Sequence, residues 1–346
     1  MLDSKTRELR DDRLEQVAHM LGERFKRAEC GQIKDFVGQF YARVSTEDIC
    51  AAAPENLYGA ALSLWKFAAQ RDAGELKLRV YNPRTEEHGW KSAHTIVEIV
   101  AEDMPFLVDS VTGNLNQWGC QVHLAIHPVI RLRRDDQGAR QELLPPVANG
   151  KPGISEAVMH VQIAEQSDGA ALEKIAADLR GVLADVRVAV ADWPAMQGQL
   201  DDAVEQMQGG GFPQSEDEVT ESRAFLSWMR DNHFTLLGCR DYGYGGELGG
   251  DELSVIPGSS LGVFCDEERH VLTRRDGVGL IAGVLMAKRF SEREEILLVT
   301  KTGERGTVHR PDHMDYIGIK RYDSDGTLIG ERRFVGLFTS SAFNRT

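Results

Sequence analysis

Hydrophobic and polar positions change their period twice between residues 94 and 134. Residues 95–101 alternate as in a half-buried strand, and residues 122–132 alternate again. Residues 106–115 instead have helical spacing, which places on one face Leu107, Val108, Val111 and Leu115. The pattern predicts a compact βαβ unit.

The ends of the predicted helix coincide with residues that suit a helix boundary. Asp103 can cap the first turn, and Pro105 has the fixed φ that favours a helix start. Gly119 can adopt the left-handed conformation that closes a helix. These residues limit the helix on both sides.

The same alternation continues after this unit. Residues 157–164 predict a third strand, residues 171–183 a second helix and residues 187–191 a short fourth strand, while residues 141–152 are rich in Pro and Gly and predict a long loop. The order β-α-β-β-α-β predicts a ferredoxin-like sandwich, in which two helices cover one face of the sheet and leave the other face bare.

The first part of the chain predicts helices that pack on another surface. One amphipathic face contains Leu14, Val17, Leu21 and Phe25, and residues 33–40 form another. Ser45 and Asp48 have the spacing of a capping box before a third helix. A helix over residues 57–69 and a strand over residues 76–81 follow. This segment is interpreted as a helical arm or dimerisation element, and its apolar face is suited to cover the bare sheet.

A second module is predicted beyond the glycines at residues 209–211. A helix over residues 216–230 precedes strands that end in a hairpin, whose turn at residues 323–326 has an Asp-Gly pair. The predicted strands cover residues 235–242, 253–255, 263–264, 295–299, 314–322 and 327–338. A PAS-like sensor module is favoured over a second ACT-like one.

The predicted class is therefore α+β, with four parts. These are an N-terminal helical segment (1–75), a ferredoxin-like domain (76–208), a linker (209–214) and a helix-led antiparallel β domain (215–346).

Composition excludes several classes of protein. The formal net charge of −14 argues against nucleic-acid binding, which needs a clustered basic surface. No apolar run approaches the roughly 20 residues of a membrane span, and the polar N-terminus is unlike a signal peptide, so a cytoplasmic location is expected. The five cysteines include no C-x-x-C pair and are interpreted as reduced thiols.

Glycines and histidines offer little catalytic or metal chemistry. Residues 277–279 nearly spell a dinucleotide fingerprint, but the βαβ context is missing, and the glycines of residues 243–250 are interpreted as a loop. His123 and His127 are four apart on a predicted strand, about 13 Å, too far to share a metal. His309 and His313 lie in a loop where hydrogen-bonded histidines are more common than metal ligands. No catalytic, cofactor or metal site is predicted.

Several longer motifs resemble one family. Residues 103–111 (DMPFLVDSV) resemble the first turn of an ACT domain, a small amino-acid-sensing module. Together with HPVIRLRRD (127–135), DNHFTLLG (231–238), HRPDHMDYIGIKRYD (309–323) and GERRFVGLFTSSAFNR (330–345), they resemble the N-terminal region of the large bacterial NAD-dependent glutamate dehydrogenases.

The resemblance implies a regulatory and assembly region whose catalytic domain lies in a later part of a longer protein. The complete enzyme would use NAD to oxidise L-glutamate to 2-oxoglutarate and ammonia, while this chain alone would bind no cofactor and be inactive. The expected partners are the remainder of the polypeptide and further copies in a homo-oligomer, and the end at Thr346 is interpreted as a truncation. The alternative is a stand-alone ACT/PAS-type amino-acid sensor or interaction module.

The resemblance also indicates where a regulatory amino acid would bind. ACT domains hold such ligands beside the turn that precedes the first helix, which here contains Asp103, Met104, Pro105, Phe106 and Asp109. Phe106 departs from the ACT pattern, which has a glycine after the proline so that the ligand can approach the backbone. Ligand site and protein interface both remain open, and the exposed apolar residue favours an interface.

Overall fold

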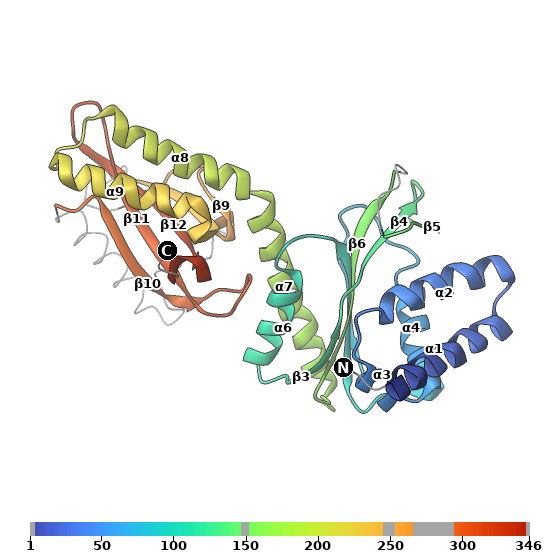
Figure 1. Ribbon diagram of the computed structural model, residues 1–346. Helices are drawn as coiled ribbons and strands as arrows, with labels where there is room; N and C mark the ends of the chain where they lie inside the picture. Colours follow the sequence, from blue (N-terminus) through green and yellow to red (C-terminus); the bar gives the residue numbers. More distant parts are fainter. Residues whose placement is uncertain (1–3, 147–151, 245–252, 266–293, 344–346) are drawn as a thin grey trace. The chain divides into compact units, whose positions relative to one another are not determined.

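The computed structural model describes residues 4–146, 152–244, 253–265 and 294–343 (Figure 1). The chain divides into two compact units. The first contains Met1–Met104 and Asn114–Gly181, and the second contains Pro105–Gly113 and Val182–Thr346. The second unit therefore begins inside a helix, ahead of the boundary expected at residues 209–214.

Helices precede and follow the strands of the first part of the chain. The helices are α1 (Ser4–Arg24), α2 (Arg27–Tyr41), α3 (Thr46–Ala51), α4 (Pro54–Phe67), α5 (Thr85–His88), α6 (Leu107–Gln117) and α7 (Gly169–Ala191). The strands are β1 (Lys77–Tyr81), β2 (Thr95–Glu102), β3 (Val122–Ile126), β4 (Val129–Arg134), β5 (Arg140–Leu143) and β6 (Ile154–Ile163). The predicted capping box is confirmed, because Ser45 Oγ accepts a hydrogen bond from the Asp48 N–H at 3.1 Å.

The sheet of the first unit has the order β1-β2-β6-β4-β5, and β3 also pairs with β6. All of these pairings are antiparallel. The edge strand beside β2 is β1, whereas the sequence pattern predicts it at residues 187–191. That prediction is wrong, because residues 187–191 continue α7. The sheet is thus a circular permutation of the expected order, because its edge strand β1 precedes β2 in the chain and does not follow the second helix.

The predicted long loop at residues 141–152 is also partly wrong. Its first residues belong to β5, which pairs with β4. In this pairing Leu132 lies opposite Leu143, and Arg134 lies opposite Arg140. The Gly138 backbone has φ of +81°, and an added Cβ would lie 2.5 Å from the Arg71 carbonyl oxygen. Only glycine fits this turn without strain, and it allows the short hairpin.

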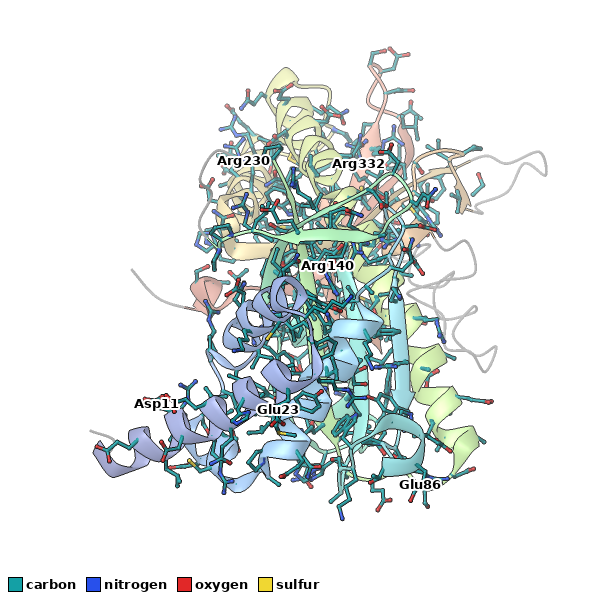
Figure 2. The ribbon with its side chains drawn as sticks, turned by 90° about the vertical axis from the view of Figure 1, so that its right-hand side faces the viewer. Asp11, Glu23, Glu86, Arg140, Arg230 and Arg332 are labelled. Carbon is teal, nitrogen blue, oxygen red and sulfur yellow. The ribbon has the colours of Figure 1, made fainter. Side chains whose placement is uncertain are left out.

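The N-terminal helices cover one face of this sheet, as their apolar pattern predicts. Val17, Leu21 and Phe36 pack in one cluster with Val100 and Val158 of the sheet. Every residue of β2 except Glu102 is buried, which requires a cover on both faces. Figure 2 labels Asp11 and Glu23, which are exposed residues of α1, and Arg140, the first residue of β5 in the sheet.

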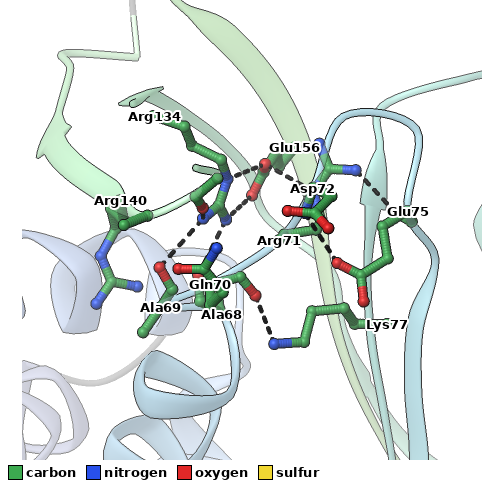
Figure 3. A network of polar contacts seen from close by, with 12 residues as sticks. Ala68, Ala69, Gln70, Arg71, Asp72, Glu75, Lys77, Arg134, Arg140 and Glu156 are labelled. Carbon is green, nitrogen blue, oxygen red and sulfur yellow. Dashed lines mark hydrogen bonds and ion pairs between the residues drawn. The ribbon is translucent and has the colours of Figure 1, made fainter. Parts of the chain in front are cut away.

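Charged residues are buried where β4, β6 and the segment after α4 meet (Figure 3). Glu156 is fully buried and accepts hydrogen bonds from Arg71 Nε at 2.8 Å and from Arg134 Nε at 2.7 Å. Arg134 also donates to the carbonyl oxygens of Ala68 and Gly138. One carboxylate thus joins two strands to the end of the helical layer.

The second unit combines helices with an antiparallel sheet. Its elements beyond α7 are α8 (Trp193–Gly209), α9 (Glu216–Trp228), β7 (Phe234–Tyr244), β8 (Leu253–Val255), β9 (Leu261–Gly262), β10 (Leu297–Arg305), β11 (His313–Tyr322) and β12 (Leu328–Phe338). The sheet order is β10-β11-β12-β7-β8, and β9 also pairs with β7. Leu200, Leu226 and Phe334 belong to one cluster, which places α8 and α9 on a single face.

Most predicted strands of this unit are present. The β11–β12 hairpin is confirmed, with the Asp323 N–H bonded to the Thr327 carbonyl at 3.0 Å and φ of +78° at Gly326. Residues 263–264 were predicted as a strand but lie in a short 3-10 helix, Val263–Cys265, after β9. The near-fingerprint at residues 277–279 and most of the glycine loop at residues 243–250 lie outside the described residues. No helix in the described part is long and apolar enough to cross a membrane.

Candidate functional site

The turn before α6 has a strained backbone at the position where ACT domains usually have glycine. Phe106 has φ of +69°, in the left-handed region. This conformation costs a non-glycine residue about 1–2 kcal/mol because its Cβ meets the neighbouring carbonyl. The turn therefore keeps a glycine-like backbone despite the change of side chain, and strain of this kind persists only where surrounding contacts hold it.

Those contacts come from the loop 306–312, between β10 and β11, which belongs to the same compact unit as Pro105–Gly113. The rings of Phe106 and His309 have centroids 5.2 Å apart. The His309 N–H donates to Ser110 Oγ at 2.9 Å. His309 itself has φ of +68°, so two strained residues face each other. We call this the turn contact, formed by Phe106, Asp109, Ser110 and Gly113 with the loop 306–312.

A charged pair and a close approach extend the turn contact. His309 Nδ1 lies 3.4 Å from Asp109 Oδ2, without hydrogen-bond geometry, so the two attract each other only when the imidazole is protonated. A Cβ added at Gly113 would lie 3.0 Å from Pro311 Cδ, so helix and loop are as close as glycine allows. The attraction between His309 and Asp109 depends on the charge of the imidazole, whereas the aromatic pair and the close packing at Gly113 do not.

The loop is also attached to α7. Thr307 Oγ1 donates to Asp185 Oδ2 at 2.5 Å, and Asp185 is buried. Within the loop, the Gly306 N–H donates to the Asp312 carbonyl at 2.9 Å. Those residues of α6 and α7 that belong to the second unit therefore both contact this loop.

The five predicted site residues are divided between the two compact units. Asp103 and Met104 end a segment of the first unit, and Pro105, Phe106 and Asp109 belong to the second. Of the five, Phe106 and Asp109 contact His309, while the Asp103 N–H donates to the Ser155 carbonyl at 3.2 Å.

Sequence reasoning missed the residues that complete the turn contact, which are Ser110, Gly113, Asp185 and the loop residues Thr307 and Pro311. The available signal in the sequence is the motif that begins at His309, which belongs to the family resemblance and contains two closely spaced histidines.

The histidine pairs weighed as metal ligands have other neighbours. His313 Nδ1 lies 3.2 Å from the Thr302 carbonyl oxygen, and the rings of His94 and His123 have centroids 4.6 Å apart. Among the residues that the structure describes, no three His, Cys, Asp or Glu side chains are grouped as a metal site would require.

The left-handed backbone predicts an inverted ranking of two substitutions. Phe106→Ala removes the ring but keeps a Cβ, whereas Phe106→Gly removes both. Glycine is usually less favourable than alanine because it loses more backbone entropy on folding. At this position we expect the Gly variant to be the more stable by about 1 kcal/mol, from relief of the strain. Urea denaturation measures the difference, and an Ala variant as stable as the Gly variant would contradict the assignment.

Comparison with known proteins identifies similar chains. Residues 36–179 match the family model described as "Glutamate dehydrogenase, ACT1 domain", which confirms the ACT resemblance for this part of the chain. The NAD-specific glutamate dehydrogenase of Halomonas elongata is 35% identical over 348 residues, which is 100% of this chain and 21% of the relative.

Two further relatives have the same description. The NAD-specific glutamate dehydrogenase of Pseudomonas aeruginosa is 34% identical, covering 91% of this chain and 19% of the relative. That of Mycobacterium tuberculosis is 28% identical, covering 81% of this chain and 16% of the relative. The chain thus spans about a fifth or less of the length of the curated relatives it matches.

Proposed function

We propose that this chain is an assembly and regulatory region of an NAD-specific glutamate dehydrogenase. It belongs to that family and matches the N-terminal region of its members. In the complete protein, NAD would accept the hydride as L-glutamate and water become 2-oxoglutarate and ammonia. The expected partners are the remaining polypeptide and further copies in a cytoplasmic oligomer. The full-chain similarity to enzymes about five times longer supports this role.

Within this region, we propose that the turn before α6 is not an amino-acid pocket but an internal contact with the loop 306–312, which supports the assembled state of the enzyme. The observation that carries the proposal is the position of His309, which stacks on Phe106 and donates its backbone N–H to Ser110. A ligand beside the turn would compete with the loop 306–312 for the same helix N-terminus. An amino-acid effector at this turn is the competing hypothesis.

We also propose that the second unit is a PAS-like module. Support comes from its antiparallel sheet, in which the first strand β7 lies between β8 and the last strand β12, and from the helices α8 and α9 on one face. A sheet with one helix-covered face leaves its other face for a ligand or another segment.

A wedge at Gly113 tests the turn contact. In Gly113→Leu, the new side chain must displace Pro311, so we expect faster hydrogen exchange in the peptide 306–312, including the His309 amide. Gly198→Leu is the matched control, because Gly198 is also a helical glycine and a Cβ there meets nothing within 4 Å. Both substitutions gain roughly 0.8 kcal/mol of helix propensity, so a difference between them reports the contact.

The same pair of variants in the complete enzyme tests the assembly role. We expect Gly113→Leu to change the oligomeric mass or the glutamate dehydrogenase activity, and Gly198→Leu to leave both unchanged. Unaltered exchange, mass and activity in Gly113→Leu would refute the assembly contact. A glutamate, aspartate or other amino-acid effector that protects the peptide 103–109 would favour the ligand hypothesis.

The isolated chain is expected to produce no NADH from glutamate. Dehydrogenase chemistry needs a nicotinamide site and a base placed against the substrate, and the sequence predicts neither in this chain. Absorbance at the NADH band, measured with purified chain and with a mock preparation, checks this expectation. Glutamate-dependent NADH formation that follows the purified chain would contradict it.

A further inference from the structure

A pocket of about 480 Å³ lies within the first unit, between the helical layer and the sheet. Its helical wall includes Ile49 of α3 and Leu57 of α4, and its floor includes His160 of β6. The segment 90–94, between α5 and β2, closes one side. We call this the cap pocket. Its volume lies within the range of about 300–1,000 Å³ that small-molecule sites have.

The polar groups around the cap pocket are mainly hydrogen-bond donors or groups that gain a proton. They include the Lys91 ammonium, the imidazoles of His94, His123 and His160, and the indole N–H of Trp90, beside the neutral side chains of Tyr41, Asn56, Ser92 and Gln162. Trp90 is only 4% exposed, and its Nε1 has no hydrogen-bond partner. Buried donors without a partner are uncommon in native proteins, so this one points to an acceptor that the pocket would receive.

The floor of the cap pocket is fixed by a buried network. His160 is fully buried, and its Nδ1 lies 3.4 Å from Glu98 Oε1. Glu98 in turn accepts from Arg79 Nε at 2.6 Å and from Tyr81 at 3.2 Å. With Nδ1 donating to Glu98, His160 Nε2 is an acceptor for the Gln162 amide at 3.5 Å. These side chains are held before any ligand arrives, which lowers the cost of binding.

The cap pocket has little negative charge, although the whole chain has a formal net charge of −14. Asp48 is the one acidic side chain among the described residues that line it, and its carboxylate already accepts from Ser45 Oγ at 2.7 Å. His94 faces His123, and burial together with that neighbour lowers the pKa of His94 below its ordinary value. Lys91 is the one lysine among the described residues that line the pocket.

We propose that the cap pocket binds a small organic anion, a carboxylate with a branched apolar body. The carboxylate would accept hydrogen bonds from Lys91 and from the neighbouring donors, while the apolar body would contact Ile49, Leu57 and Ile126. The described lining residues include one lysine and no arginine. This set suits one carboxylate better than a phosphate, because a phosphate usually takes several cationic or backbone donors. The inference is independent of the turn contact, because the two features share no residue.

A matched pair of probes tests the charge requirement. Isothermal titration calorimetry of the full chain with 4-methylpentanoate should show saturable binding, whereas 4-methylpentanamide, which has the same shape without the charge, should bind at least about tenfold more weakly. Inorganic phosphate is the third arm. Equal affinity for the amide, no binding of the acid, or stronger binding of phosphate would each overturn the proposal.

Two pairs of variants locate the site. Lys91→Met should weaken binding of 4-methylpentanoate about tenfold, whereas Lys66→Met, at an exposed lysine of α4 outside the pocket, should leave it unchanged. His94→Gln should weaken binding, and His127→Gln, at an exposed histidine outside the lining, should not. Both target residues are exposed or half-exposed, so the variants should fold. If Lys91→Met and His94→Gln bind as the unaltered chain does, the anion does not occupy the cap pocket.

Discussion

Replacing Glu156 by alanine is expected to lower the free energy of unfolding of the first unit by about 3–5 kcal/mol. Glu156 is fully buried between Arg71 and Arg134, and its two oxygens accept hydrogen bonds from both guanidinium groups. Its removal would leave two cations buried together without an anion. The cost of two unpaired buried charges exceeds the net stabilisation by the ion pairs, because the folded state has already removed both guanidinium groups from water.

An exposed ion pair between β4 and β5 is the control. Glu142 pairs with Arg133, whose side chain is 53% exposed. Glu142→Ala should therefore cost only about 0–1 kcal/mol. Denaturation in urea compares the two variants. Similar losses for Glu156→Ala and Glu142→Ala would show that the buried network contributes no more than a surface ion pair.

The same carboxylate makes stability depend on pH. Burial alone would raise the pKa of Glu156, but hydrogen bonds from Arg134 and Arg71 outweigh burial and hold the pKa below its ordinary value. A pKa that is lower in the folded state than in the unfolded state gives stability above the unfolded value of about 4.3, and this stability is lost as pH falls through the folded pKa. The stability advantage of the unaltered chain over Glu156→Gln should thus shrink at acidic pH. An advantage that grows on acidification would contradict the sign.

Removing residues 1–66 is expected to make the remaining chain aggregate. The deletion takes away α1 to α4 and uncovers Val100, Ile126, Ile130, Leu132 and Val158, which pack against these helices. An exposed apolar patch on a sheet is an aggregation hazard, and no other described element packs on these five residues in that cluster. Light scattering should show large particles or a changed oligomeric mass.

Rescue in trans is the control for this deletion. A separate peptide of residues 1–66, added during refolding, should restore particle size, since its apolar faces are complementary to the sheet. A monodisperse deletion product with unchanged stability and no response to the peptide would show that the helical layer is dispensable.

Much of the fold follows from periodicity, because long amphipathic stretches have only one face to bury. The faces at Leu14–Phe25 and Leu107–Leu115 predict helices, and the Asp-Gly turn before Thr327 predicts a hairpin. The strand prediction for residues 187–191 was wrong because this stretch is too short for its period to be decisive. RVAVA is short and rich in β-branched residues, so strand and helix cannot be told apart by pattern alone, and the long α7 extends through it.

The candidate site was harder to predict, because it depends on residues that are far apart in the chain. The sequence pointed to Phe106, which departs from the ACT pattern, and separately to the motif that begins at His309, but no spacing indicated that these two residues lie against each other. The cap pocket was missed altogether, since Trp90, Lys91 and His160 have no recognisable spacing. Only the pairing of the sheet and the packing of α3 and α4 bring them together.

The position of β1 at the edge of the first sheet has a consequence for protein synthesis. Had the edge strand followed α7, the sheet could not close until residue 191 had been made. Here the last strand of the sheet ends at Ile163, so all its strands exist before α8 or any strand of the second sheet has been translated. At about 5–20 residues per second, several seconds or more separate the two sheets on the ribosome. In the nascent chain, β1 can thus form hydrogen bonds with the backbone groups at the edge of β2 before later strands are available to pair there.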